Sequence, residues 1–140
     1  MKKAVIHITD RHISDGEEFV CELTTSGEFE RTESGFTVIY NETDEELADC
    51  LTTLSIEGSE RILMTRTGKY NTEMILEKER RHSCYYSTPY GDLMMGIYAK
   101  SISNSLGENG GCVKFAYTID FNNEPASENE LTVTVKAQEE

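Results

Sequence analysis

The sequence has no tryptophan, only two prolines, and no apolar run long enough to cross a membrane as a helix. Cations are scarce as well. Its 140 residues include 13 lysines and arginines against 26 aspartates and glutamates, a net charge of −13 with the histidines neutral. The electrostatic field of this net negative charge repels phosphate backbones and anionic lipid head groups, so neither nucleic acid nor a membrane is an expected partner.

Motifs that hold metals or form disulfides are also missing. The four cysteines, Cys21, Cys50, Cys84 and Cys112, lie far apart and form no C-x-x-C pair, and no histidine stands at metal-ligand spacing. The apolar stretch at the N-terminus is too short and too interrupted for a signal peptide. We therefore expect reduced and mostly buried thiols, a cytoplasmic location, no metal and no cofactor. A secreted domain with two disulfides is the alternative that the even cysteine count leaves open.

What the chain has in abundance is alternation of apolar and polar residues, the pattern of half-buried β-strands. The segments that show it are 4–13, 19–25, 35–41, 51–56, 61–66, 70–77, 84–90, 93–99, 113–121 and 131–135. No helical stripe, repeat or linker interrupts them. The sequence thus predicts one all-β domain over residues 1–140, an antiparallel barrel or sandwich.

Short glycine-containing segments are predicted to turn the chain between these strands. Asp15-Gly16 and Glu57-Gly58-Ser59 predict tight turns, and Ser26-Gly27 predicts the end of a strand or a bulge. Residues 103–111 and 122–130 are predicted to be loops.

Three stretches carry a resemblance to a known family. They are R-T-G-K-Y-N-T-E-M at 66–74, T-P-Y-G-D-L at 88–93 and T-T-L-S-I at 52–56. With them the chain resembles, from its first strand to Lys136, the YwiB-like family of small bacterial proteins of unknown function. It departs from the family pattern at Asn41, where an acidic residue is expected. The resemblance implies an up-and-down calycin-like barrel of about 8–10 strands, similar to lipocalins, and implies no known reaction.

Arg66 is the first candidate site residue, because it shares a strand face with Ile62 and Met64. A guanidinium among apolar side chains is suited to gripping the carboxylate or phosphate of a ligand in a barrel interior. Alternatively, Arg66 pairs with an internal carboxylate or closes one end of the barrel. Either role predicts a partly buried side chain.

The other candidates are Tyr86, Thr88 and Tyr90, which alternate along one strand and could line the same interior with hydroxyl groups. The alternative is a structural corner, because Pro89 removes a backbone donor and Gly91 permits a sharp bend.

The sequence supports three functions, in descending order. The first is a binding module for a small apolar or anionic ligand, and the second is a filled barrel that engages another protein. The third is an enzyme that uses Arg66 with a tyrosine or with Glu77, and no catalytic residue is assigned for it. The basic residues of 78–82 indicate a polar hairpin tip or an anion dock. A homodimer is a further expectation, because an incompletely closed barrel leaves strand edges unpaired.

Overall fold

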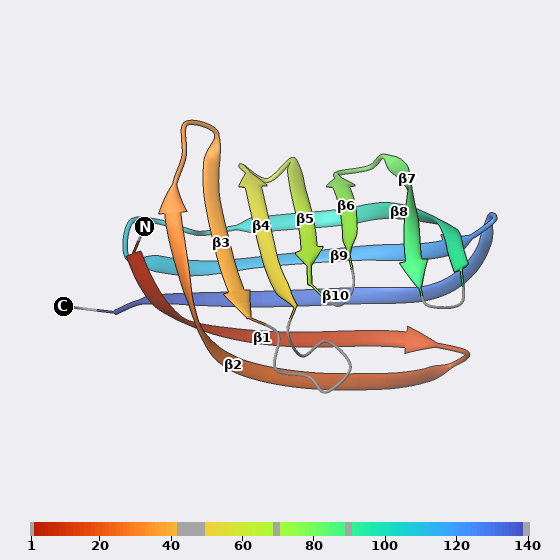
Figure 1. Ribbon diagram of the computed structural model, residues 1–140, viewed down its shortest axis with the longest axis horizontal. Helices are drawn as coiled ribbons and strands as arrows, with labels where there is room; N and C mark the ends of the chain where they lie inside the picture. Colours follow the sequence, from red (N-terminus) through yellow and green to blue (C-terminus); the bar gives the residue numbers. More distant parts are fainter. Residues whose placement is uncertain (1, 42–49, 69–70, 89–90, 139–140) are drawn as a thin grey trace.

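The computed structural model describes residues 2–41, 50–68, 71–88 and 91–138, and ten β-strands account for most of them (Figure 1). The strands are β1 (Lys2–Ser14), β2 (Glu17–Arg31), β3 (Gly35–Asn41), β4 (Leu51–Glu57), β5 (Arg61–Thr67), β6 (Thr72–Glu77), β7 (Arg81–Thr88), β8 (Gly91–Asn104), β9 (Gly110–Phe121) and β10 (Glu124–Ala137). In the described ranges there is no helix that could span a membrane.

All ten strands form one antiparallel sheet in the order β6-β5-β4-β3-β2-β1-β10-β9-β8-β7. Strands consecutive in the chain pair with each other, except β6 and β7, and β1 pairs with β10, so the sheet curls into a nearly closed barrel. Its two edges, β6 and β7, meet at a seam that is bridged at the Glu77–Arg80 turn. The prediction of an all-β, up-and-down, calycin-like barrel of 8–10 strands is confirmed.

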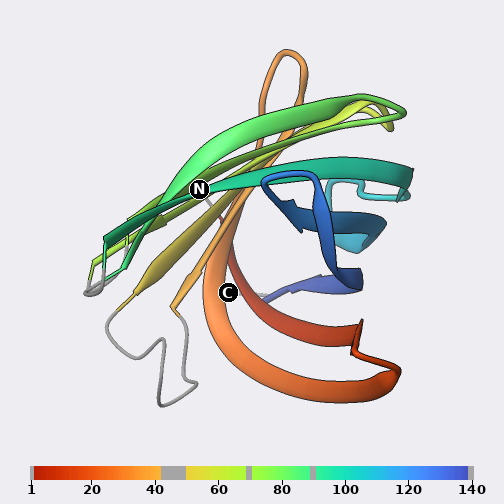
Figure 2. The ribbon, with the colours of Figure 1, turned by 90° about the vertical axis from the view of Figure 1, so that its right-hand side faces the viewer.

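The barrel is flattened into two layers. Strands β3 to β6 form one layer, and they cross the long strands β9 and β10 of the other layer steeply (Figure 1). Strand β7 pairs along its whole length with the first part of β8. Strands β1 and β2 curve from one layer to the other (Figure 2). Crossed layers of this kind enclose the core between their inner faces.

The core of the β3–β6 layer consists of two apolar rows that run across the strands. The first row comprises Phe36, Ile56, Ile62 and Leu76, and the second comprises Val38, Leu54, Met64 and Met74. All of these side chains are buried except Phe36, which packs against the core. The rows arise because alternate residues of each strand face inward and the register aligns them.

Two predicted strand limits are wrong. Strand β2 continues through Ser26-Gly27, because Gly27 lacks the Cβ that would collide with the Ile39 carbonyl and with Ile6. Strand β10 starts at Glu124, within the predicted loop 122–130, and a register shift between Pro125 and Ser127 accommodates the proline. Part of the predicted loop 103–111 also belongs to strands, since β8 runs to Asn104.

All four cysteines are free, which agrees with the expected reduced thiols. The expectation that most of them are buried is wrong. Only Cys50 is buried, Cys84 and Cys112 are half-buried, and Cys21 is exposed. Cys21 lies on a part of β2 that extends past β3, where no opposing layer covers it.

Candidate functional site

A third inner-face row of the β3–β6 layer is polar, unlike the two apolar rows beside it. The register pairs Tyr40 with Thr52, Thr52 with Arg66 and Arg66 with Thr72. We call these four residues the polar row. Tyr40, Thr52 and Thr72 are buried, and Arg66 is half-buried with its Nε atom fully enclosed. The row places a guanidinium inside the barrel, one step along the strands from Met64 and Met74.

Tyr117 lies on the inner face of β9, in the layer opposite the polar row. Its ring is buried and stacks on Phe115, with the ring centroids 5.9 Å apart. Burial raises the pKa of Tyr117 well above its usual range, the carboxylate of Asp10 raises it further, and the guanidinium of Arg66 opposes both. Arg66 and Asp10 therefore both lie near enough for their charges to act on the Tyr117 phenol.

Thr72 adds an unsatisfied polar group to this place. Its hydroxyl is buried, and no described residue forms a hydrogen bond with it. A buried hydroxyl without a partner costs about 1–3 kcal/mol, so native structures normally satisfy such groups with protein, water or ligand. Arg66 pairs with Thr72 in the sheet, and its guanidinium carries five N–H donors. The polar row is thus chemically suited to an acceptor-rich group.

We predict that Tyr117 makes the protein sensitive to alkaline pH. The folded pKa is raised, so the native state keeps its proton above about pH 10, where an unfolded tyrosine ionises. Stability linked to Tyr117 is complete below that pH and falls by about 1.4 kcal/mol per pH unit above it until the folded pKa is reached. Urea unfolding of wild type and Tyr117→Phe between pH 8 and pH 11 measures this as a widening difference.

The matched control for this experiment is Tyr98→Phe, which removes an exposed phenol from β8. Its pH profile should run parallel to that of the wild type. A parallel profile for Tyr117→Phe as well would contradict the buried, proton-retaining phenol.

Of the four site residues predicted from the sequence, the structure places Arg66 in this site and does not describe the side chains of the other three. Arg66 lies in it and is partly buried, as both of its predicted roles require. Tyr86 and Thr88 belong to the backbone of β7, but their side chains lie outside the described part of the structure, and Tyr90 lies outside the described residues altogether. Thr88 pairs with Gly91, so the chain does reverse at the predicted corner. Ligand contact by these three residues stays a prediction.

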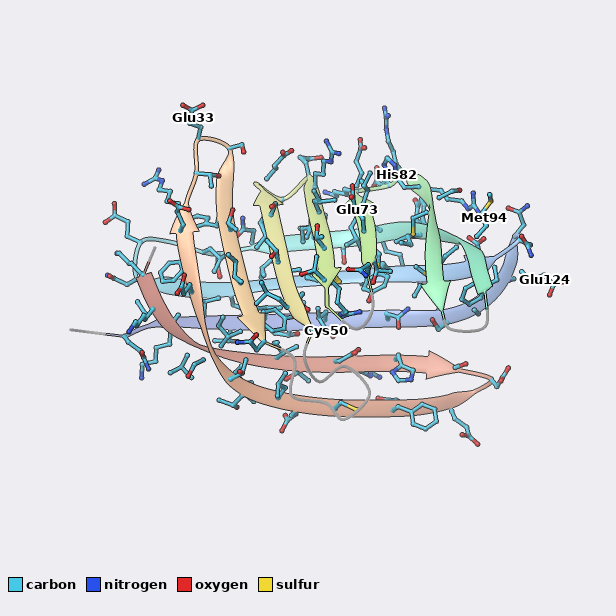
Figure 3. The ribbon with its side chains drawn as sticks, viewed as in Figure 1. Glu33, Cys50, Glu73, His82, Met94 and Glu124 are labelled. Atoms are coloured by element: carbon cyan, nitrogen blue, oxygen red, sulfur yellow. The ribbon has the colours of Figure 1, made fainter. Side chains whose placement is uncertain are left out.

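Glu77 does not face Arg66. It lies opposite Arg61 in the sheet, and its Oε1 is 3.0 Å from Nε2 of His82 while its Oε2 is 3.4 Å from Nε of Arg80. An acid–base pair of Arg66 and Glu77 is therefore wrong. His82 lies at the upper end of the seam (Figure 3).

Three of the four basic residues of 78–82, namely Arg80, Arg81 and His82, contact acids. Arg81 grips Asp120 with two hydrogen bonds, of 3.0 Å from Nε and 2.7 Å from Nη2. That grip lowers the pKa of Asp120. Arg80 and His82 contact Glu77. The polar hairpin tip is the better description of this segment.

A hollow of about 210 Å³ lies along the seam below His82. Glu73 and Ile75 of β6 and His82 and Cys84 of β7 line it. Figure 3 labels Glu73 and His82. Burial raises the pKa of the Cys84 thiol, and the charge of Glu73 raises it further, which disfavours a reactive thiolate. Within the described residues, no three metal-binding side chains cluster here or elsewhere.

Asp10, Thr52 and Thr72 were not predicted as site residues from the sequence. A signal for two of them was present, because Thr52 and Thr72 continue the inward-facing alternation of Leu54 and Met74. A polar residue at the same end of neighbouring apolar stripes indicates a polar band across the sheet. Asp10 gives no such signal, since its position depends on how the barrel closes.

Residues 6–133 match a protein family described as "Domain of unknown function (DUF1934)". The chain belongs to this family. This chain is also similar to a solved structure, described as the crystal structure of ywiB protein from Bacillus subtilis. The TM-score is 0.86 and the sequence identity is 20%. The similarity covers 99% of this chain and 93% of the other, which shows a shared fold and agrees with the YwiB-like resemblance. A search of curated proteins gave no match.

Proposed function

We propose that this barrel binds a small, partly apolar anion, with the anionic group held at the polar row. One observation carries the proposal: half-buried Arg66, whose Nε atom is enclosed, pairs in the sheet with Thr72, whose hydroxyl is buried and unsatisfied. A carboxylate or phosphate accepts hydrogen bonds from both groups. Arg66 is the anchor, and Tyr86, Thr88 and Tyr90 remain the proposed lining residues.

The surroundings of Arg66 favour a ligand with both an anionic and an apolar part. Met64 and Met74 form the adjacent row, and unbranched thioether side chains adapt to irregular apolar groups. The guanidinium fork binds an oxyanion with two parallel hydrogen bonds, which are stronger away from bulk water. The charge of Asp10 sets a limit, because it repels an anion that reaches as far as Tyr117.

The interior beyond the polar row is filled by the core. Both apolar rows are buried and pack against residues of the other layer. This packing supports the alternative function, an interaction module with a filled barrel, for that end of the molecule. A ligand at the polar row is consequently small.

The proposed location is the cytoplasm. Four free cysteines, one of them exposed on β2, support a reducing compartment, where thiols stay unpaired.

Native mass spectrometry of protein purified from its own host tests the proposed ligand. We expect a stoichiometric small-molecule adduct on the wild type and its loss, by at least about tenfold in occupancy, in Arg66→Lys. Lysine keeps the charge but lacks the planar fork. The matched control is Arg61→Lys on the same strand, whose arginine is exposed, and this variant should keep the adduct.

Thermal unfolding of both variants confirms that they are folded before binding is compared. An apo mass for the wild type, together with no thermal shift from a panel of carboxylates and phosphates, would rule out the binding module. Equal adduct on Arg66→Lys and wild type would rule out Arg66 as the anchor.

A further inference from the structure

Strand β2 extends well past its neighbour β3. Strand β3 pairs only with residues 27–31 of β2, so no described strand pairs with the outer edge of residues 17–26. We call residues 17–26 the β2 edge. Every side chain from Glu17 to Glu22 is exposed, including 45% of Phe19 and 57% of Val20. In Figure 2 the β1–β2 hairpin sweeps away from the β3–β6 layer.

The register shows which backbone groups this edge presents. The two-residue turn Asp15-Gly16, with φ of 52° and 77°, makes Ser14 and Glu17 a hydrogen-bonded pair. Such pairs alternate along an antiparallel ladder, so the N–H and C=O groups of Glu18, Val20 and Glu22 point away from β1. The Lys3 carbonyl, which accepts a 2.9 Å hydrogen bond from the Gln138 amide beside β10, confirms this alternation.

The β2 edge lacks most of the features that keep strand edges apart. Residues 17–31 contain neither proline nor lysine, and the β1–β2 register is continuous from Lys2–Phe29 to Ser14–Glu17. Prolines, lysines and bulges are the usual protections of an exposed edge. A long, regular edge with exposed Phe19 and Val20 is suited to accepting another strand.

The charge of this hairpin indicates which strand would fit. Residues 10–22 contain five carboxylates, of Asp10, Asp15, Glu17, Glu18 and Glu22, and one arginine, Arg11, which gives a net charge of −4 with His12 neutral. Arg11 is paired with Glu18 on the neighbouring strand. Glu22 stands on the same outer face as Val20, beside the exposed backbone groups.

We propose that the β2 edge is a docking surface for an extended, basic segment of another protein, which adds an eleventh strand to the sheet. Main-chain hydrogen bonds to Glu18, Val20 and Glu22 hold the segment, and its lysines or arginines face the glutamates. A second copy of this chain is a poor occupant, because pairing two β2 edges would bring two net charges of −4 together. The surface is independent of the interior site.

An alternating Lys-Val heptapeptide, blocked at both ends, is the probe, and a Glu-Val heptapeptide is its matched control. Amide hydrogen exchange by NMR is expected to slow at least about tenfold at Glu18, Val20 and Glu22 with the basic peptide only. Val20→Pro should abolish binding and still fold, because it removes an N–H that points outward from an edge strand. Val20→Thr keeps that N–H and should bind.

Charge-reversal variants distinguish binding at the β2 edge from nonspecific attraction to the net negative charge of the protein. Glu22→Lys should weaken the basic peptide at least about tenfold, whereas Glu33→Lys, on the β2–β3 turn (Figure 3), changes the net charge equally and should leave the affinity unchanged. Equal weakening by both variants would overturn the proposal. So would protection at other amides, unchanged binding by Val20→Pro, or a dimer of the protein that protects these same amides.

Discussion

Phe115→Ala is expected to lower the free energy of unfolding by about 3–5 kcal/mol. The Phe115 side chain is 0% exposed and lies on β9 between Leu131 of β10 and Ile102 of β8. Removing it deletes the ring that Tyr117 stacks on and leaves a cavity that the two packed layers cannot close. Urea unfolding at pH 7 followed by circular dichroism measures the loss.

Phe19→Ala is the matched control for this substitution. The ring of Phe19 is 45% exposed on the β2 edge and stacks on His12 at 5.0 Å. Its removal should cost about 1 kcal/mol or less, because exposed aromatic pairs contribute little beyond their small buried area. Similar losses for the two variants would show that the core does not centre on Phe115.

Gly27→Ala is expected to cost about 1–3 kcal/mol and to disturb the start of β3. The added Cβ would collide with the Ile39 carbonyl and with the end of the Ile6 side chain. Ile6 can rotate away, but a backbone carbonyl moves only with its strand. Because Gly27 pairs with Tyr40, this movement would displace one end of the polar row. Urea unfolding and the amide NMR shifts of β3 report the two effects.

The neighbouring Ser26→Ala is the control for Gly27→Ala. Ser26 lies on the exposed outer face of β2, and its replacement should change stability by less than about 0.5 kcal/mol. An unchanged unfolding free energy for Gly27→Ala would mean that β2 and β3 separate there without cost.

The inward faces of the strands could be predicted from the sequence, because a strand has a period of two residues. Ile62, Met64 and Arg66 share the inner face of β5 as predicted, and Thr72 and Met74 share that of β6. These faces depend only on local alternation. The number of such segments and the short turns between them predicted a barrel or a sandwich, and the family resemblance implied the barrel.

The meeting of Arg66, Tyr117 and Asp10 could not be predicted in the same way. Their strands β5, β9 and β1 are not neighbours in the sheet, and they come together only when β1 pairs with β10 and the sheet curls. The continuation of β2 through Gly27 was missed for a similar reason. Local propensity favours ending a strand at glycine, and the close approach of Ile39 reverses that preference.

The seam between β6 and β7 changes the mechanics of the barrel. In a fully closed barrel every strand is hydrogen-bonded to a neighbour on both sides, so the barrel resists widening. In the described part of this barrel, no ladder joins β6 to β7. Near the upper end of the seam, the side chains of Glu77, Arg80 and His82 connect the two strands. Such partly exposed pairs contribute about 1 kcal/mol or less each. The barrel can therefore widen along this line without breaking a ladder between its paired strands.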